Sequence, residues 1–172
     1  MSQATRLKTQ LENVREMSEG FLQAFETPEQ WTHQVDPNAN HALWFAGHMG
    51  TADNFFISVV DPDKGREADG YSEVFGMGSQ PTSDVDFYPP VDEVLAYMRD
   101  RRVVLLNILS SMSDADLAQP KPEGGPDMFT DLASVFETAI WHEALHAGQV
   151  SVARRALGHA PLFGSPKAEA EA

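Results

Sequence analysis

The spacing of apolar residues predicts four long amphipathic helices. In each segment apolar side chains recur at intervals of three and four residues, which places them on one face of a helix. The predicted helices cover residues 3–25, 40–60, 91–111 and 131–157. The clearest stripe, in the first segment, consists of Leu7, Leu11, Val14, Ser18, Phe21 and Phe25. No segment shows a convincing alternation typical of strands, so the pattern predicts an all-α protein.

Capping and breaking residues define the ends of these helices. Pro28 ends the first helix, because the residue before a proline avoids helical geometry. Asn38 or Asn40 is the predicted N-cap of the second helix, and Asp131 that of the fourth. Ser113 is expected to cap a short turn between the third and fourth helices. Four helices of roughly 20 residues with long connections predict a four-helix bundle.

The connection formed by residues 61–90 is long for a compact domain. It is rich in aspartate, glycine and proline and has no regular period. Loops of this length are usually functional or disordered. Five apolar side chains predict that this one packs on the bundle: Tyr71, Phe75, Met77, Phe87 and Tyr88. We expect it to act as a lid and selectivity element over the site described below.

Length and charge restrict the classes of protein. A chain of 172 residues can form one domain with a real core, predicted over residues 1–164, followed by a disordered acidic tail at 165–172. The net charge of −14, from 26 acids and 12 bases, argues against nucleic acid and anionic lipid as partners. No stretch approaches the roughly 20 apolar residues that cross a membrane.

The cysteine count and the N-terminal sequence restrict the chemistry and the location. The chain has no cysteine, so it can form no disulfide, no thiolate metal site and no cysteine nucleophile. Any thiol chemistry therefore needs a thiol from outside. The first residues lack the apolar core of a secretory signal. The expected location is the cytoplasm.

Three histidines are the strongest candidates for functional residues. His142 and His146 are four residues apart, so they project from one helical face about one turn apart and can share a metal ion. They lie in the apolar stripe of their helix, and His48 does the same between Trp44 and Ala52. The pattern predicts that all three point into the bundle. Three imidazoles suit zinc, nickel, copper or iron and leave a position open for water or substrate.

A purely structural role for these histidines is the alternative. A single histidine on an apolar stripe is more often a hydrogen-bonded core residue than a metal ligand. If three buried imidazoles do not share a metal ion, however, their six ring nitrogens all need separate hydrogen-bond partners. We therefore favour a metal site. His41 is predicted to be an exposed residue of the capping region of its helix, with a place beside the metal ligands as the alternative, and His33 and His159 are predicted to lie in loops.

Residues 142–146 also match the H-E-x-x-H pattern of zinc metallopeptidases, in which Glu143 would be the general base. The longer form of the pattern fails after His146, and the only downstream acids, Glu169 and Glu171, lie in the predicted tail. A peptidase is therefore the less favoured interpretation. Glu143 is expected at the edge of the apolar stripe, touching solvent or a partner subunit, and a catalytic role for it is the alternative.

Arg101 and Arg102 raise a smaller question. One of them must fall near the inward stripe of the third helix, where Arg102 is a weak candidate to contact an anionic group of a substrate. The alternative is an arginine that pairs with an acid or reaches solvent at the edge of the bundle.

The three tryptophans are expected to be packing residues. Trp44 is close enough to His48 to line one side of the site.

Two short motifs carry a resemblance to a known family. They are Trp-Phe-Ala-Gly-His-Met-Gly at 44–50 and Trp-His-Glu-Ala-Leu-His-Ala-Gly-Gln-Val at 141–150, and the run at 156–162 also fits. The chain resembles the DinB-like superfamily, metal-binding four-helix bundles that include YfiT-type hydrolases, bacillithiol transferases and mycothiol-dependent isomerases. The resemblance places the metal histidines of that family on His48, His142 and His146. It implies zinc, nickel or iron, and often a homodimer packed through bundle helices.

The resemblance also implies a class of reaction, because characterised relatives often transfer groups to or from low-molecular-weight thiols. We therefore predict a metal-dependent enzyme that acts on a small substrate, as a thiol-dependent S-transferase or as a hydrolase. A non-catalytic metal-binding or dimerisation bundle is the alternative.

Overall fold

A computed structural model describes residues 1–164 and confirms the all-α four-helix bundle. The long helices are α1 (Gln3–Leu22), α3 (Ala42–Val60), α5 (Val91–Ser110) and α7 (Leu132–Ala156). Short helices occupy the connections: α2 (Pro28–Trp31), η1 (Pro62–Lys64), α4 (Tyr71–Phe75), η2 (Val85–Phe87) and α6 (Asp114–Leu117). Within the described residues no strand forms. The predicted tail at 165–172 lies outside the described residues.

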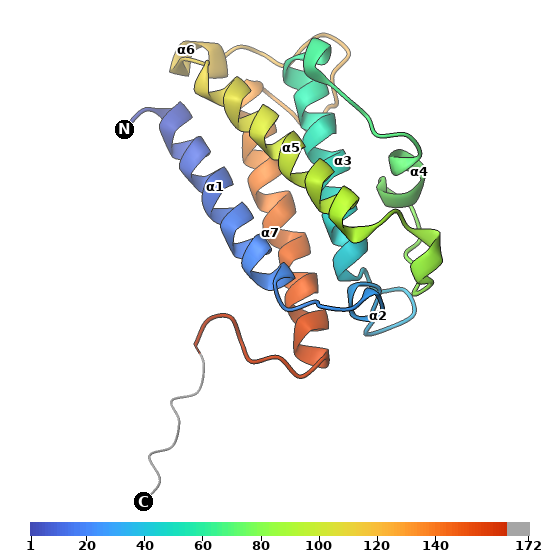
Figure 1. Cartoon of the computed structure of the whole chain (residues 1–172). Helices are drawn as coiled ribbons and strands as arrows, with labels where there is room; N and C mark the ends of the chain where they lie inside the picture. The colour runs from blue at the N-terminus through green and yellow to red at the C-terminus, as the bar shows by residue number, and fades with distance from the viewer. Residues whose placement is uncertain (165–172) are drawn as a thin grey trace, which may run out of the picture.

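The order of the helices explains the long second connection. α3 and α5 run in the same direction, as do α1 and α7, and the two pairs are antiparallel to each other (Figure 1). Contacts along α3 and α5 accordingly advance together, with Gly50 beside Met98 and Asp53 bonded to Arg102. A parallel neighbour requires a connection that returns along the whole bundle, and residues 61–90 provide it.

The predicted N-caps hold at α6 and α7 but not at α3, and α1 ends at Leu22, three residues before its predicted end. The Asp131 side chain accepts from the Ser134 amide at the start of α7, and Ser113 caps α6. At α3 the predicted asparagine cap is wrong, because the N-cap is His41, whose Nδ1 accepts from the Trp44 amide at 3.1 Å. Capping ties the imidazole to the backbone, so α3 begins at Ala42, two residues after Asn40.

His41 is also buried, contrary to the prediction that it is exposed. Because its Nδ1 accepts a hydrogen bond, the neutral ring carries its proton on Nε2, which donates to the Tyr88 hydroxyl at 3.0 Å. Burial lowers the pKa of His41 to about 4. His41 therefore joins the start of α3 to the end of the 61–90 connection.

The core consists of two apolar halves with a charged layer between them. One half surrounds the first part of α3 and includes Phe45, Met49, Phe75, Met98 and Val150. The other half lies toward the opposite end of the bundle and includes Leu7, Leu11, Ile57, Leu105 and Phe136. The layer between them holds four buried charged residues, one from each long helix: Arg15, Asp53, Arg102 and Glu143.

The 61–90 connection packs on the bundle through part of the predicted set. Tyr71, Phe75 and Tyr88 are buried, whereas Met77 and Phe87 are 98% and 51% exposed. The Phe75 ring lies directly against Gly47 of α3, where a Cβ atom would meet the ring at 2.3 Å. Only glycine leaves room for this contact, which fixes α4 on α3 (the two are side by side in Figure 1). The predicted role of this connection as a lid stays a prediction.

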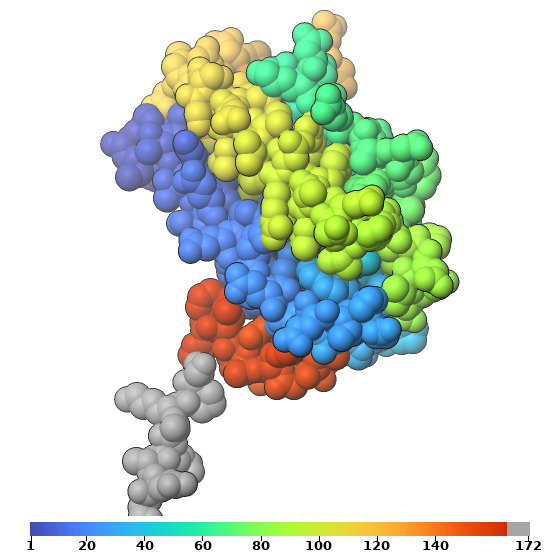
Figure 2. Space-filling model, viewed as in Figure 1, coloured from blue at the N-terminus to red at the C-terminus, as the bar shows by residue number. Residues whose placement is uncertain are grey.

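Figure 2 shows the surface of the bundle with the helices closely packed. None of the described helices combines the length and the apolar character needed to cross a membrane.

Replacing Gly47 by alanine should destabilise the protein. The added methyl group would overlap the Phe75 ring, and overpacking of this kind lowers the free energy of unfolding by about 1–3 kcal/mol. Denaturant unfolding followed by circular dichroism measures the change. The control is the same substitution in a Phe75→Leu background, where the ring is gone and the cost should shrink. An equal cost in both backgrounds would contradict the contact.

Candidate metal centre

The three predicted ligand histidines meet between α3 and α7. Their candidate ligand atoms all lie within 4.8 Å of one another, and the Nε2 atoms of His48 and His142 are 3.3 Å apart. Two imidazole nitrogens on one tetrahedral zinc ion lie about 3.3 Å apart, because each Zn–N distance is about 2.0–2.1 Å. The two atoms are within hydrogen-bond distance of each other, and they also have the spacing that a shared ion requires.

Hydrogen bonds preset the orientation of two of these rings. His48 Nδ1 lies 2.7 Å from the carbonyl oxygen of Phe75. A carbonyl only accepts, so Nδ1 carries the proton of the neutral ring and Nε2 presents a lone pair to the cluster. His146 Nδ1 makes the corresponding contact to Gln149 Oε1 at 2.9 Å. Both rings therefore offer Nε2 to a metal ion.

The environment keeps the three imidazoles neutral, which is the form that binds metals. Burial lowers the pKa of His48 to about 4, and the charges of His146 and His142 add to this effect. Burial, together with His146, lowers the pKa of His142 to about 4. Burial also lowers the pKa of His146.

Aromatic rings surround the cluster. Trp44 stacks on His48 with ring centroids 4.4 Å apart and lies 5.8 Å from His146, which confirms its predicted place as a wall. The Phe56 and Trp141 centroids lie 6.2 and 6.1 Å from that of His142. The prediction that Trp141 is a packing residue is wrong, since it is 52% exposed.

The histidine cluster lies at the edge of the interface between α3 and α7, called the α3–α7 seam below, and not in the centre of the bundle. His48 is buried, but His142 and His146 are partly exposed, so the prediction that all three point inward holds only for His48. The centre is occupied by the charged layer. The seam leaves the cluster accessible from one side of the molecule.

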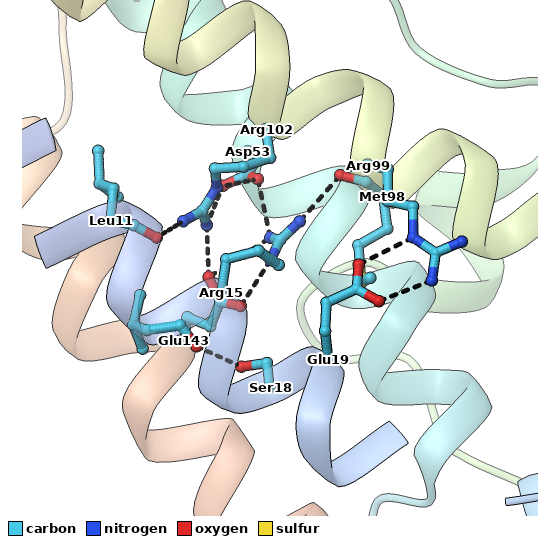
Figure 3. A network of polar contacts seen from close by, with 10 residues as sticks. Leu11, Arg15, Ser18, Glu19, Asp53, Met98, Arg99, Arg102 and Glu143 are labelled. Atoms are coloured by element: carbon cyan, nitrogen blue, oxygen red, sulfur yellow. Dashed lines mark hydrogen bonds and ion pairs between the residues drawn. The ribbon is translucent and has the colours of Figure 1, made fainter. Parts of the chain in front are cut away.

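The charged layer is a closed network of ion pairs (Figure 3). Glu143 accepts from Arg15 Nε at 2.7 Å and from an Arg102 terminal nitrogen at 2.5 Å. Asp53 accepts two bonds from Arg102, both at 2.9 Å, and one from Arg15 at 3.1 Å. The four charges sum to zero, and each long helix contributes one of them.

Backbone carbonyls complete the hydrogen bonding of the two arginines. Arg102 donates to the carbonyl of Leu11 at 3.0 Å, and Arg15 donates to that of Met98 at 3.1 Å. A buried charge is tolerated when its partners and hydrogen bonds are complete, as they are here. Sequence reasoning missed Arg15 and Asp53. The sequence feature that could have identified them is a charged residue within the apolar face of a long helix.

Glu143 therefore differs from its predicted position, whereas Arg102 lies on the inward stripe and follows the alternative of pairing with acids. Glu143 is fully buried and does not touch solvent, and Arg102 is 3% exposed and pairs with acids. Burial alone would raise the pKa of Glu143, but Arg15 and Arg102 outweigh it and hold the pKa below the ordinary value. A carboxylate with a lowered pKa and both oxygens bonded to arginines is a poor general base, so the peptidase role loses its support.

The fold and the cluster together define an all-α bundle with three histidines gathered between its second and fourth long helices. Residues 10–150, which include all three histidines and the whole charged layer, match the family model of the DinB superfamily. The chain belongs to the DinB superfamily, as the resemblance of its motifs implied. None of the curated proteins matches the chain.

Replacing Glu143 by glutamine should weaken the bundle strongly, because it leaves two buried guanidinium groups with one carboxylate. The expected loss in the free energy of unfolding is about 3–5 kcal/mol. The lowered pKa makes the ionised form of Glu143 the stabilising one, so the loss should be full above pH 4.5 and shrink as the pH falls through the lowered pKa.

Urea unfolding at several pH values measures this difference. Glu16→Gln is the matched control, since Glu16 directly follows Arg15 on α1 and is exposed, and its change should stay within about 0.5 kcal/mol. A small effect of Glu143→Gln at neutral pH would contradict the network.

Proposed function

We propose that the protein is a metal-dependent enzyme that acts on a small substrate, with a divalent zinc, nickel or iron ion held by His48, His142 and His146. The observation that carries this proposal is the 3.3 Å spacing between the Nε2 atoms of His48 and His142. The hydrogen bonds that turn Nε2 of His48 and His146 toward the cluster support it. When bound, such an ion polarises the group under attack and lowers the pKa of a coordinated water or thiol.

The surroundings of the histidines indicate how this chain would assist the reaction. Three protein ligands leave room for a further ligand, and the part-exposed His142 and His146 provide the open side. The rings of Trp44 and Phe56 form an apolar border that would exclude water from a bound substrate. The ion pairs behind the site, through Glu143, would hold α7 in place.

The reaction that we propose is a thiol-dependent S-transfer or a hydrolysis. The chain has no cysteine, so the thiol would be a low-molecular-weight cosubstrate in the cytoplasm. Hydrolysis would use water in the same position.

The second candidate is a non-catalytic metal-binding or dimerisation bundle, and the outer face of α7 favours dimerisation in either case. Trp141, Leu145 and Val152 are 52%, 58% and 56% exposed, and with Gly148 they form a stripe at spacings of four, three and four. Exposed apolar stripes of this kind mark interaction surfaces. We propose that a second copy of the chain covers it.

The stripe is self-complementary if two α7 helices pack antiparallel with their centre between residues 146 and 147. Trp141 would then face the partner's Val152, and Leu145 would face the partner's Gly148, where nothing lies within 4 Å of an added Cβ atom. At both ends Glu137 would meet the partner's Arg155. The two charges thus favour the antiparallel arrangement.

Replacing His146 by alanine should abolish metal binding and leave the helix content unchanged, because the site loses a ligand at the edge of the bundle. The wild-type protein, produced without a histidine tag, should contain about one ion per chain by elemental mass spectrometry. His33→Ala is the matched control and should keep the metal, since His33 lies outside the cluster.

Absence of metal from the wild type, with none taken up on titration, would overturn the metal site. Metal binding without turnover of thiols and small electrophiles or esters would favour the non-catalytic candidate.

The dimer is tested by single cysteines, for which this chain offers a cysteine-free background. In the antiparallel pair, position 145 lies about 4.5 Å along the axis from its own equivalent, whereas position 152 lies about 16 Å away. Leu145→Cys should therefore form a disulfide-linked dimer on oxidation, and Val152→Cys should not. Cross-linking at both positions would indicate a parallel pair, and a monomeric mass in sedimentation would exclude the dimer.

A further inference from the structure

A side-chain amide joins the third histidine to the start of α3. Gln149 lies almost one turn after His146 on α7, and its Oε1 accepts from His146 Nδ1 at 2.9 Å. The same oxygen accepts from Asn40 Nδ2, also at 2.9 Å. Asn40 directly precedes His41, the N-cap of α3. The contact therefore links the two helices that bring the histidines together.

The three histidines are supported in different ways. A buried backbone carbonyl, that of Phe75, orients His48. His142 packs between the rings of Phe56 and Trp141. His146 is oriented by a side chain, so its support can be removed by substitution without altering the backbone. This makes Gln149 the position at which the effect of orientation can be measured.

Asn40 and His146 contact the same end of the Gln149 amide. A glutamine amide can present either its oxygen or its NH₂ group. With Asn40 donating to the oxygen, that oxygen also faces His146 and accepts the Nδ1 proton. The reversed amide would donate to Nδ1 and place the imidazole proton on Nε2, which blocks that nitrogen as a metal ligand.

We propose that Gln149, oriented by Asn40, is a positioning residue that holds His146 as the Nδ1-protonated tautomer with Nε2 toward His48 and His142, and thereby raises the affinity of the cluster for a metal ion. The part of this proposal that concerns affinity rests on the proposed metal site. The part that concerns the tautomer stands without it. Partners of this kind typically change metal affinity by about 10–100-fold.

The first experiment measures the tautomer in the metal-free protein by long-range proton–nitrogen NMR of the imidazole rings. In the wild type His146 should be protonated on Nδ1. In Gln149→Leu, which removes the acceptor, a substantial Nε2-protonated population should appear, and Gln149→Glu should restore the wild-type tautomer. An unchanged tautomer in Gln149→Leu would overturn the proposal whether or not the protein binds metal.

The second experiment measures zinc affinity by competition with a chromophoric chelator. Gln149→Leu should bind zinc about 10–100-fold more weakly, Asn40→Ala should lose less, and Gln149→Glu should bind at least as tightly as the wild type. Gln10→Leu, an exposed glutamine on α1, is the matched control and should change nothing.

The outcomes separate the two proposals. A wild type that binds none of zinc, nickel and iron but shows the expected tautomers refutes the proposed function and the claim on affinity, and leaves the positioning of His146 established. A wild type that binds zinc with the same affinity as Gln149→Leu refutes the inference and leaves the proposed function intact.

Discussion

The buried ion-pair network is the constraint on which the rest of the structure depends. Four long helices each place one charge in the same layer, and every charge is paired within it. A shift of one helix by a single residue would move its charge by about 1.5 Å and rotate it by about 100°, leaving a buried charge without its partner. Apolar contacts tolerate repacking far better than this. The network therefore fixes the register of the bundle.

The register in turn places the histidines. Asp53 and His48 lie on α3, and Glu143 and His142 lie on α7, so the bonds made by the acids determine which turns of the two helices face each other. The imidazoles then need only local support. His48 receives it from Phe75, which the connection between α3 and α5 brings to Gly47. A connection that the parallel pair α3 and α5 requires for topological reasons thus also orients a candidate ligand.

Much of the fold could be predicted from the sequence because the relevant signals are local. Each long helix is found within about three residues of its expected ends, since the apolar period and the turn residues act over a few positions. His142 and His146 could be paired for the same reason, because four residues make about one turn of any helix. The proximity of His48 to these two histidines could be predicted only from the family resemblance or from the fold, because His48 is 94 residues from His142.

The direction in which each helix faces could not be predicted as well. The histidines were taken to mark the inner face of α7, but the bundle axis lies on the side of Ala139, Glu143 and Ala147, about a quarter turn away. On α3 the apolar Phe55 is 45% exposed, whereas the charged Asp53 is buried. A charged residue is normally assigned to solvent, and only its partner on a distant helix reverses that assignment. Arg15 and Glu143 are 128 residues apart, so no local pattern could reveal the pair.

Three consecutive residues of α7 show how one helix serves three surfaces. Trp141 faces outward in the exposed stripe, His142 faces the seam with α3, and Glu143 faces the charged layer. Successive residues of a helix are separated by about 100°, so three in a row necessarily point in three directions. The residues of the H-E-x-x-H pattern therefore have separate functions in this helix. The glutamate forms ion pairs in the charged layer, and the two histidines belong to the cluster. A glutamate between two such histidines can act as the base of a peptidase only when it is free to accept a proton near the metal, and in this bundle both of its oxygens are bonded to arginines of the charged layer.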